Sequence, residues 1–175
     1  MTPSDPPPLL GKIGSAALVL AFHTLVALLF VSVISIVVIG TAANVLASLP
    51  HKDIFAECFV FVIGLGVGFV ANRASLKRVA CWVWIPGLTW LAFGIWDSAR
   101  DFDPRSSQGC SAVQYIVNSF FVLDSSKCNG GEGAGLSGLF FTLPAFCSVA
   151  YSVGAWIALM VGRRDRNTTA SIHST

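Results

Sequence analysis

Long apolar runs alternate with short polar segments along the chain. Four of these runs, at about 14–40, 54–72, 79–96 and 139–162, approach or exceed the roughly 20 apolar residues that a membrane-spanning helix needs. None of them shows the two-residue alternation that is typical of strands in a membrane β-barrel. The pattern therefore predicts an all-α fold, an integral membrane four-helix bundle over residues 14–162.

The first apolar run is predicted to remain in the mature protein. A cleaved signal peptide has an apolar core of roughly 7–15 residues, and this run is much longer. The segment 1–13 before it is short and proline-rich, and we expect it to be disordered. Residues 163–175 after the fourth run are expected to form a tail.

The composition agrees with a bilayer as the environment of the chain. Hydrophobic residues make up 54% and charged residues 11%, with a mean hydropathy of +0.73, whereas a soluble domain has about 25% charged residues. The formal net charge of +2 is too small to indicate nucleic acid, and no basic and aromatic segment stands out along the sequence. We therefore expect the lipid bilayer, and no nucleic acid, as a partner.

The charges predict on which side of the membrane each connection lies. The connection between the second and third runs reads RASLKR, and the C-terminal tail begins RRDR. Because lysine and arginine are retained on the cytoplasmic side, both segments, and with four spans also the N-terminus, are predicted to be cytoplasmic. The segment 97–138 is then the outer loop. This topology fits a bacterial inner membrane or a eukaryotic plasma membrane.

Two of the five cysteines bracket an apolar element in the outer loop, CSAVQYIVNSFFVLDSSKC. Cys58, Cys81 and Cys147 fall in predicted spans, where cysteine is usually a small apolar filler. Cys110 and Cys128 would face an oxidising compartment, so we predict a disulfide between them, worth roughly 3 kcal/mol through loop closure. A metal site is the less favoured alternative, because no CxxC motif or nearby histidine accompanies these cysteines.

The bracketed element is predicted to be a short helix over about 111–125. Ser111 and Gln114 have the spacing of a capping box, and the polar residues of the element fall on one narrow stripe. The remaining surface is apolar and provides the candidate lid residues Val113, Ile116, Val117, Phe120 and Phe121. Two interpretations stay open: a lid over the outer mouth of the bundle, or an element that simply completes the hydrophobic core.

Small residues recur at intervals of four in two of the predicted spans. The second span has Gly64 and Gly68, and the fourth has Ala150, Gly154 and Ala158. Such small-xxx-small spacing lets two membrane helices approach closely. We expect these two spans to make the tightest packing, within one chain or between chains.

Two prolines lie in the third and fourth spans, at Pro86 and Pro144. Each lacks a backbone N–H, so we expect both spans to bend at these positions. Whether the bends shape a cavity or have no functional role stays open.

Two ionisable side chains lie at membrane depth, His23 in the first span and Glu57 in the second. The default interpretation of such groups is functional. A rise of about 1.5 Å per residue separates their depths by roughly 16 Å, which excludes direct contact. We expect His23 to be neutral and satisfied by a hydroxyl such as that of Thr24. The basic residues expected near Glu57 are Lys52, Arg100 and Arg105.

Motifs of enzymatic chemistry are missing from the sequence. It contains no HExxH, GxSxG or CxxC motif and no paired intramembrane carboxylates. We therefore expect no enzyme, no cofactor and no bound metal. The leading hypothesis is a small membrane protein of the cell envelope with a structural or partner-binding role, as a homo-oligomer or with another membrane protein. The alternative is a binder or transporter of an apolar or lipid-like small molecule, with the 111–125 helix as its lid.

Overall fold

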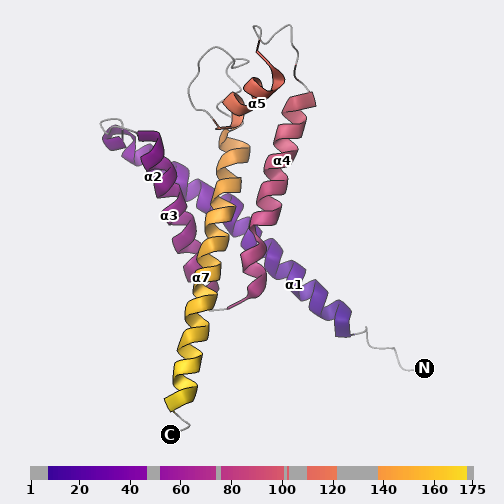
Figure 1. The fold of residues 1–175 in the computed structure, drawn as a ribbon, viewed down its shortest axis with the longest axis vertical. Helices are drawn as coiled ribbons and strands as arrows, with labels where there is room; N and C mark the ends of the chain where they lie inside the picture. The colour runs from indigo at the N-terminus through magenta and orange to yellow at the C-terminus, as the bar shows by residue number, and fades with distance from the viewer. Residues whose placement is uncertain are drawn as a thin grey trace, which may run out of the picture.

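All regular secondary structure in the described part of the chain is helical (Figure 1). The computed structural model describes residues 8–46, 52–73, 76–100, 102, 110–121 and 138–172. Side chains are described for residues 13–41, 56–73, 76–100, 102, 110–120 and 139–164. Four helical stretches are long and apolar enough to cross a membrane: Ile13–Thr41, Ala56–Arg73, Arg78–Arg100 and Leu139–Arg164. The prediction of an all-α fold with four helices able to span a membrane is confirmed.

The first span is continuous but changes its helical type near the middle. It consists of α1 (Pro8–Leu25), the π-helical segment η1 (Val26–Val31) and α2 (Ser32–Leu46). Proline is favoured at the first turn of a helix, where its missing N–H has no intrahelical partner to lose. The helix therefore includes residues 8–13, which corrects part of the disorder expected for the segment 1–13; residues 1–7 lie outside the described part.

The second and third spans run in opposite directions. The second is α3 (Lys52–Arg73), and the third consists of the 3₁₀ segment η2 (Arg78–Trp82) followed by α4 (Trp84–Arg100). Because the connection between them is short, the end of α3 and the start of α4 lie at the same end of the bundle (Figure 1).

The fourth span begins irregularly and becomes the longest helix. It consists of the π-helical segment η3 (Gly138–Thr142) and α7 (Leu143–Ile172), so the helix continues into the predicted tail. The short helix α5 (Ala112–Phe121) lies at the end of the bundle where α4 finishes and α7 starts (Figure 1).

The two ends of the bundle differ in charge. We call one of them the basic end, because it carries Arg73, Lys77, Arg78, Arg163 and Arg164. The start of α1 and the end of α7 point to the same side as this end, and α5 lies at the opposite one (Figure 1). This arrangement is the one that four alternating spans require.

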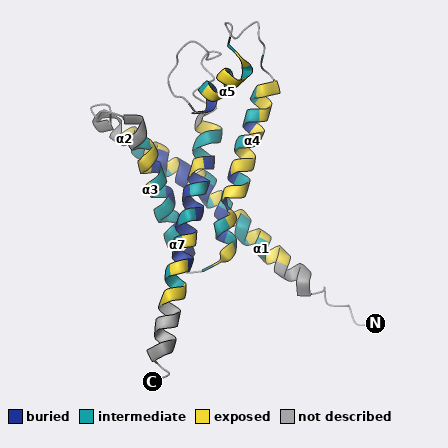
Figure 2. Cartoon of the chain, viewed as in Figure 1, coloured by how far each residue is buried: buried dark blue, intermediate teal, exposed yellow. Residues whose placement is uncertain are grey.

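Helix α7 is the central element of the bundle. In an apolar window of 18 residues within its span, 56% of the residues are buried, whereas the corresponding windows of the other three spans have at most 28%. Helices α3 and α4 and the segments η1 and η2 pack against it, and more of the described buried residues lie along it than along any other helix (Figure 2). The other spans therefore take their positions from α7 more than from one another.

The closest approach is between α3 and α7, at small residues of both helices. A methyl group added at Gly68 would meet the backbone carbonyl of Tyr151, and one at Gly154 would meet that of Leu65. A methyl group at Gly64 would lie 2.7 Å from the Cβ of Ala150. The structure thus brings together the small residues that the sequence singled out on these two spans. Ala158, also singled out, is 1% exposed on α7.

Asn72 holds the end of α3 against α7 and organises the turn into η2. Its side-chain Nδ2 donates to the Ala155 carbonyl at 2.9 Å, and its Oδ1 accepts from the Lys77 N–H at 2.9 Å. The Asn72 carbonyl accepts from the N–H of Leu76, which has a φ of 47°, in the left-handed region that non-glycine residues rarely adopt. Leu76 in turn packs against Gly162 of α7.

The two prolines each lie just after a change of helical type. Pro86 lies in the first turn of α4, after η2, and Pro144 lies in the first turn of α7, after η3. A proline is tolerated in the first turn of a regular α-helix. The predicted bends at the two prolines stay predictions.

Replacing Gly68 by alanine should destabilise the bundle by about 1–3 kcal/mol, because the added methyl meets a backbone carbonyl that cannot move aside easily. Gly66→Ala is the matched control, since no atom lies within 4 Å of the position of its methyl. The control should be neutral, or stabilising by up to about 1 kcal/mol through helix propensity. Unfolding in detergent micelles, followed by circular dichroism, measures both. Equal free energies for the two variants would contradict the α3–α7 contact.

Candidate functional site

His23 is buried in the bundle and hydrogen-bonded to a tyrosine of α7. Its Nδ1 lies 2.5 Å from the hydroxyl of Tyr151, and the two residues are 4% and 0% exposed. The hydroxyl that satisfies His23 is thus that of Tyr151 and not, as expected, that of Thr24. Thr24 Oγ1 has no hydrogen-bond partner in the described part of the chain. Within that part, no group of three His, Cys, Asp or Glu side chains is placed to hold a metal ion.

Glu57 lies apart from His23, on the exposed surface of α3 near its start. Of its expected partners, Arg100 is exposed at the end of α4, whereas Arg105 and the side chain of Lys52 lie outside the described part. The structure therefore does not join the two intramembrane ionisable groups into one site.

Helix α5 has the predicted capping box, and one of its sides packs against η3. The Ser111 N–H donates to Gln114 Oε1 at 3.1 Å, and the Gln114 N–H donates to Ser111 Oγ at 3.3 Å, so the capping box is confirmed. Phe120 is 3% exposed and packs against the ring of Phe141, with ring centroids 5.9 Å apart. The Thr142 hydroxyl donates to the Phe120 carbonyl at 2.7 Å.

The other candidate lid residues of α5 are not gathered over a cavity. Val113 is 70% and Val117 is 43% exposed, and Ile116 is half-buried. The side chain of Phe121 lies outside the described part. Neither pocket described below is lined by a residue of α5.

The described cysteines fall into two groups. Cys58, Cys81 and Cys147 are free thiols, exposed, half-buried and buried respectively. Cys110 is not among the free thiols, and its predicted partner Cys128 lies outside the described part. The pairing of Cys110 with Cys128 therefore stays a prediction.

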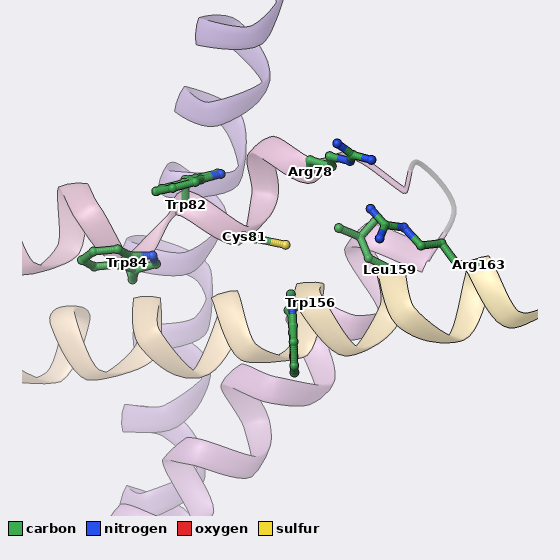
Figure 3. Close-up of a pocket in the computed structure, with 7 residues that line it drawn as sticks. All are labelled: Arg78, Cys81, Trp82, Trp84, Trp156, Leu159 and Arg163. Carbon is green, nitrogen blue, oxygen red and sulfur yellow. The ribbon is translucent and has the colours of Figure 1, made fainter.

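A pocket of about 500 Å³ opens at the basic end, where η2, α4 and α7 meet (Figure 3). Two arginines, three tryptophans and two smaller apolar residues line it: Arg78, Cys81, Trp82, Trp84, Trp156, Leu159 and Arg163. The first four come from η2 and the start of α4. The last three come from one face of α7, since they recur at intervals of three and four residues.

Hydrogen bonds fix the wall of this pocket to α7. The backbone N–H of Trp84 donates to Ser152 Oγ at 2.9 Å, and the Ser152 hydroxyl donates to the Ser148 backbone carbonyl at 2.9 Å. Trp82 and Trp84 stack, with ring centroids 6.5 Å apart and an interplanar angle of 25°. Both rings are exposed, as is typical of tryptophans at the headgroup level of a bilayer.

A second pocket of about 420 Å³ continues from the first between α4 and α7. It shares Cys81, Trp84 and Trp156 with the first pocket. The further residues that line it are almost all apolar: Leu88, Val149, Ser152 and Val153. We call the two pockets together the α4–α7 groove. It is basic and aromatic at one end and apolar along the rest.

The positive charge of the groove has no acidic counterpart among the described side chains. The carboxylates described are those of Glu57 and Asp97. One lies near the start of α3 and the other near the end of α4, away from the basic end in both cases (Figure 1). Arg78 and Arg163 are both exposed. The groove therefore suits an amphipathic molecule with a negatively charged head.

This groove was not predicted from the sequence. Arg78, in RASLKR, and Arg163, in RRDR, indicated only the cytoplasmic side. One signal was present: Trp156 and Arg163 recur on the same helical face of the fourth span. The residues of the third span come to lie opposite this face only because η2 and α4 pack against α7.

Comparison of the chain with protein families, curated proteins and solved structures finds no match. The function is therefore argued from the geometry of the groove itself.

Replacing Tyr151 by phenylalanine should leave His23 without its partner while keeping the packing of the ring. Interhelical hydrogen bonds in membranes contribute about 0.6–2 kcal/mol, so a loss of stability in that range is expected. Tyr115→Phe, on α5, is the matched control, because the Tyr115 ring packs against Phe102 and does not contact His23. Unfolding in micelles measures both variants. Unchanged stability of Tyr151→Phe would show that the His23–Tyr151 bond does not hold α1 to α7.

Proposed function

We propose that the protein is a membrane-embedded binder of a lipid-like, amphipathic molecule, which it holds in the α4–α7 groove. The observation that carries the proposal is that two neighbouring pockets, one basic and aromatic and one apolar, share Cys81, Trp84 and Trp156 in their walls. A binder of a lipid-like molecule is the alternative left open from the sequence, but the proposed site is a different one. The groove lies between α4 and α7 towards the basic end, and not beneath α5.

The size and lining of the groove support this proposal. Small-molecule sites usually have volumes of about 300–1,000 Å³ and walls that are apolar or aromatic with a few polar groups. The two pockets, of about 500 and 420 Å³, fall in this range. Their tryptophans offer flat apolar surfaces with a polar N–H edge. The apolar stretch suits a hydrocarbon chain, and the basic end suits a polar head.

A bilayer limits what the apolar stretch can contribute. Lipid tails are as apolar as leucine, so a hydrocarbon chain gains no hydrophobic free energy when it leaves the lipid for the groove. Shape and dispersion contacts remain, but they are similar for the hydrocarbon chains of most lipids and do not distinguish one lipid from another. Selection among lipids must then come from the basic end.

A structural or partner-binding role is the second candidate, and one surface favours it. Trp90, Phe93 and Trp96 form a row on α4 with ring centroids 6.2 Å apart between successive rings. All three side chains are at least 45% exposed. Such a row suits another apolar helix, of a second copy or of another membrane protein, as well as lipid.

The topology that accompanies the proposal places the basic end and both chain termini in the cytoplasm. Retention of arginine and lysine on that side supports it. The groove would then open to the inner leaflet of a bacterial inner membrane or a plasma membrane. Helix α5 would lie outside, with the proposed Cys110–Cys128 disulfide bracketing it.

Filling the apolar stretch should remove the bound molecule. Val153 is half-buried and lines the groove, so Val153→Phe should lower the fraction of protein that retains a lipid by about tenfold, equivalent to about 1.4 kcal/mol. Val62→Phe is the matched control, because Val62 is 64% exposed on α3 and does not line the groove. Native mass spectrometry of protein released from lipid nanodiscs measures the retained fraction. Equal retention of lipid by the Val153→Phe and Val62→Phe variants would contradict the proposal.

The proposed outer disulfide has its own test. Without reductant, the intact mass should fall short of the reduced mass by two hydrogens, and peptide mapping should join Cys110 to Cys128. Cys58, Cys81 and Cys147 serve as internal controls, because their free thiols should be alkylated without reduction after unfolding. Alkylation of Cys110 and Cys128 in the same sample would overturn the disulfide and weaken the proposed orientation.

A further inference from the structure

We infer that Arg78 and Arg163 together bind the phosphate group of an anionic phospholipid, drawn from the leaflet at the basic end. The inference rests on the proposed function, because it assigns the head group of the lipid-like molecule held in the α4–α7 groove. It commits to a bilayer lipid, since the phosphate site opens directly into an apolar stretch that no free phosphate would need.

The first support is the convergence of two arginines from distant parts of the chain. Arg78 comes from η2 and Arg163 from α7, and both line the same pocket. In Figure 3 the Arg163 side chain extends back along α7 towards the Arg78 side of the pocket. Guanidinium groups bind phosphate oxygens in pairs of parallel hydrogen bonds, so two of them from different sides can hold one phosphate group.

The second support is the charge of the described side chains at this end of the bundle. Glu57 and Asp97, the carboxylates among the described side chains, lie away from the basic end. Arg73, Lys77 and Arg164 add positive charge at that end. Basic pockets between membrane helices on the cytoplasmic side are typical sites for acidic head groups. The complementary ligand is therefore an anion.

The third support is the order of surfaces along the groove. The arginines lie at the basic end of the groove, the stacked pair Trp82 and Trp84 comes next, and the apolar lining of α4 and α7 follows. A phospholipid presents its groups in the same order: phosphate, ester-linked interface, hydrocarbon chain. Indole rings prefer the interfacial level between head and chain. The groove thus matches one phospholipid along its length.

The test is a lipid competition in nanodiscs that contain equal parts of dioleoyl phosphatidylglycerol and dioleoyl phosphatidylcholine, which have the same chains. Native mass spectrometry of the released protein gives the ratio of the two lipids retained. Both lipids carry a phosphate, but the choline of the zwitterionic lipid places a positive charge beside it, which the two guanidinium groups repel. The wild-type protein should therefore retain mainly the anionic lipid. The double variant Arg78→Gln/Arg163→Gln should lower that preference by at least about tenfold, and it should still retain the zwitterionic lipid.

The matched control is Arg73→Gln/Arg164→Gln, which removes the same charge from the same end of the bundle without touching the groove. It should keep the wild-type preference within about twofold, because general surface charge acts weakly compared with a paired site. Arg78→Lys/Arg163→Lys keeps the charge but loses the bidentate geometry. That variant should fall between the wild type and the glutamine pair.

The outcomes separate this inference from the proposed function. Retention of both lipids in equal amounts by the wild type, with loss of both in Val153→Phe, would overturn the site for an anionic head group and leave the groove binder standing. An equal fall in preference for the control pair would overturn the site in favour of bulk charge. A wild type that retains neither lipid would overturn the inference and the proposed function together. Circular dichroism of each variant confirms that it is folded.

Discussion

The structure depends on the close approach of α3 to α7, where glycines bring the two backbones into contact. Lipid offers no hydrophobic force between helices, so association relies on packing and on interhelical hydrogen bonds. Gly68 meets the backbone of Tyr151, and Gly154 meets that of Leu65. The side chain of Tyr151 then reaches His23 on α1. One residue of α7 therefore contacts the second span through its backbone and the first span through its hydroxyl, so three spans converge on it.

The position of the groove depends on the same α3–α7 packing, because one asparagine at the end of α3 connects it to η2. Asn72 bonds to the α7 backbone at Ala155 and to the chain that leads into η2. This fixes where η2 starts, and the Trp84–Ser152 hydrogen bond fixes where α4 starts. As a result, Arg78 and Arg163 come to line one pocket, although they are far apart in the sequence. The candidate site is thus a consequence of how α3 ends.

The two ends of the bundle suit different tasks. At one end α5 is docked by Phe120 and leaves Val113 exposed, an arrangement that suits contact with the bilayer interface. At the other end the arginines and tryptophans form the groove. Apolar contacts discriminate little between lipids in a bilayer, so under the proposed function any selection among lipids would come from the charged end.

The sequence by itself determined the four apolar spans, the capping box of α5 and the small residues of the second and fourth spans, because these depend on residue type and local spacing. Only the tertiary structure decided that Tyr151, not Thr24, satisfies His23, because a hydroxyl on another helix leaves no local signal. The groove depends on packing for the same physical reason: Arg78 and Trp156 become neighbours only when α4 lies against α7.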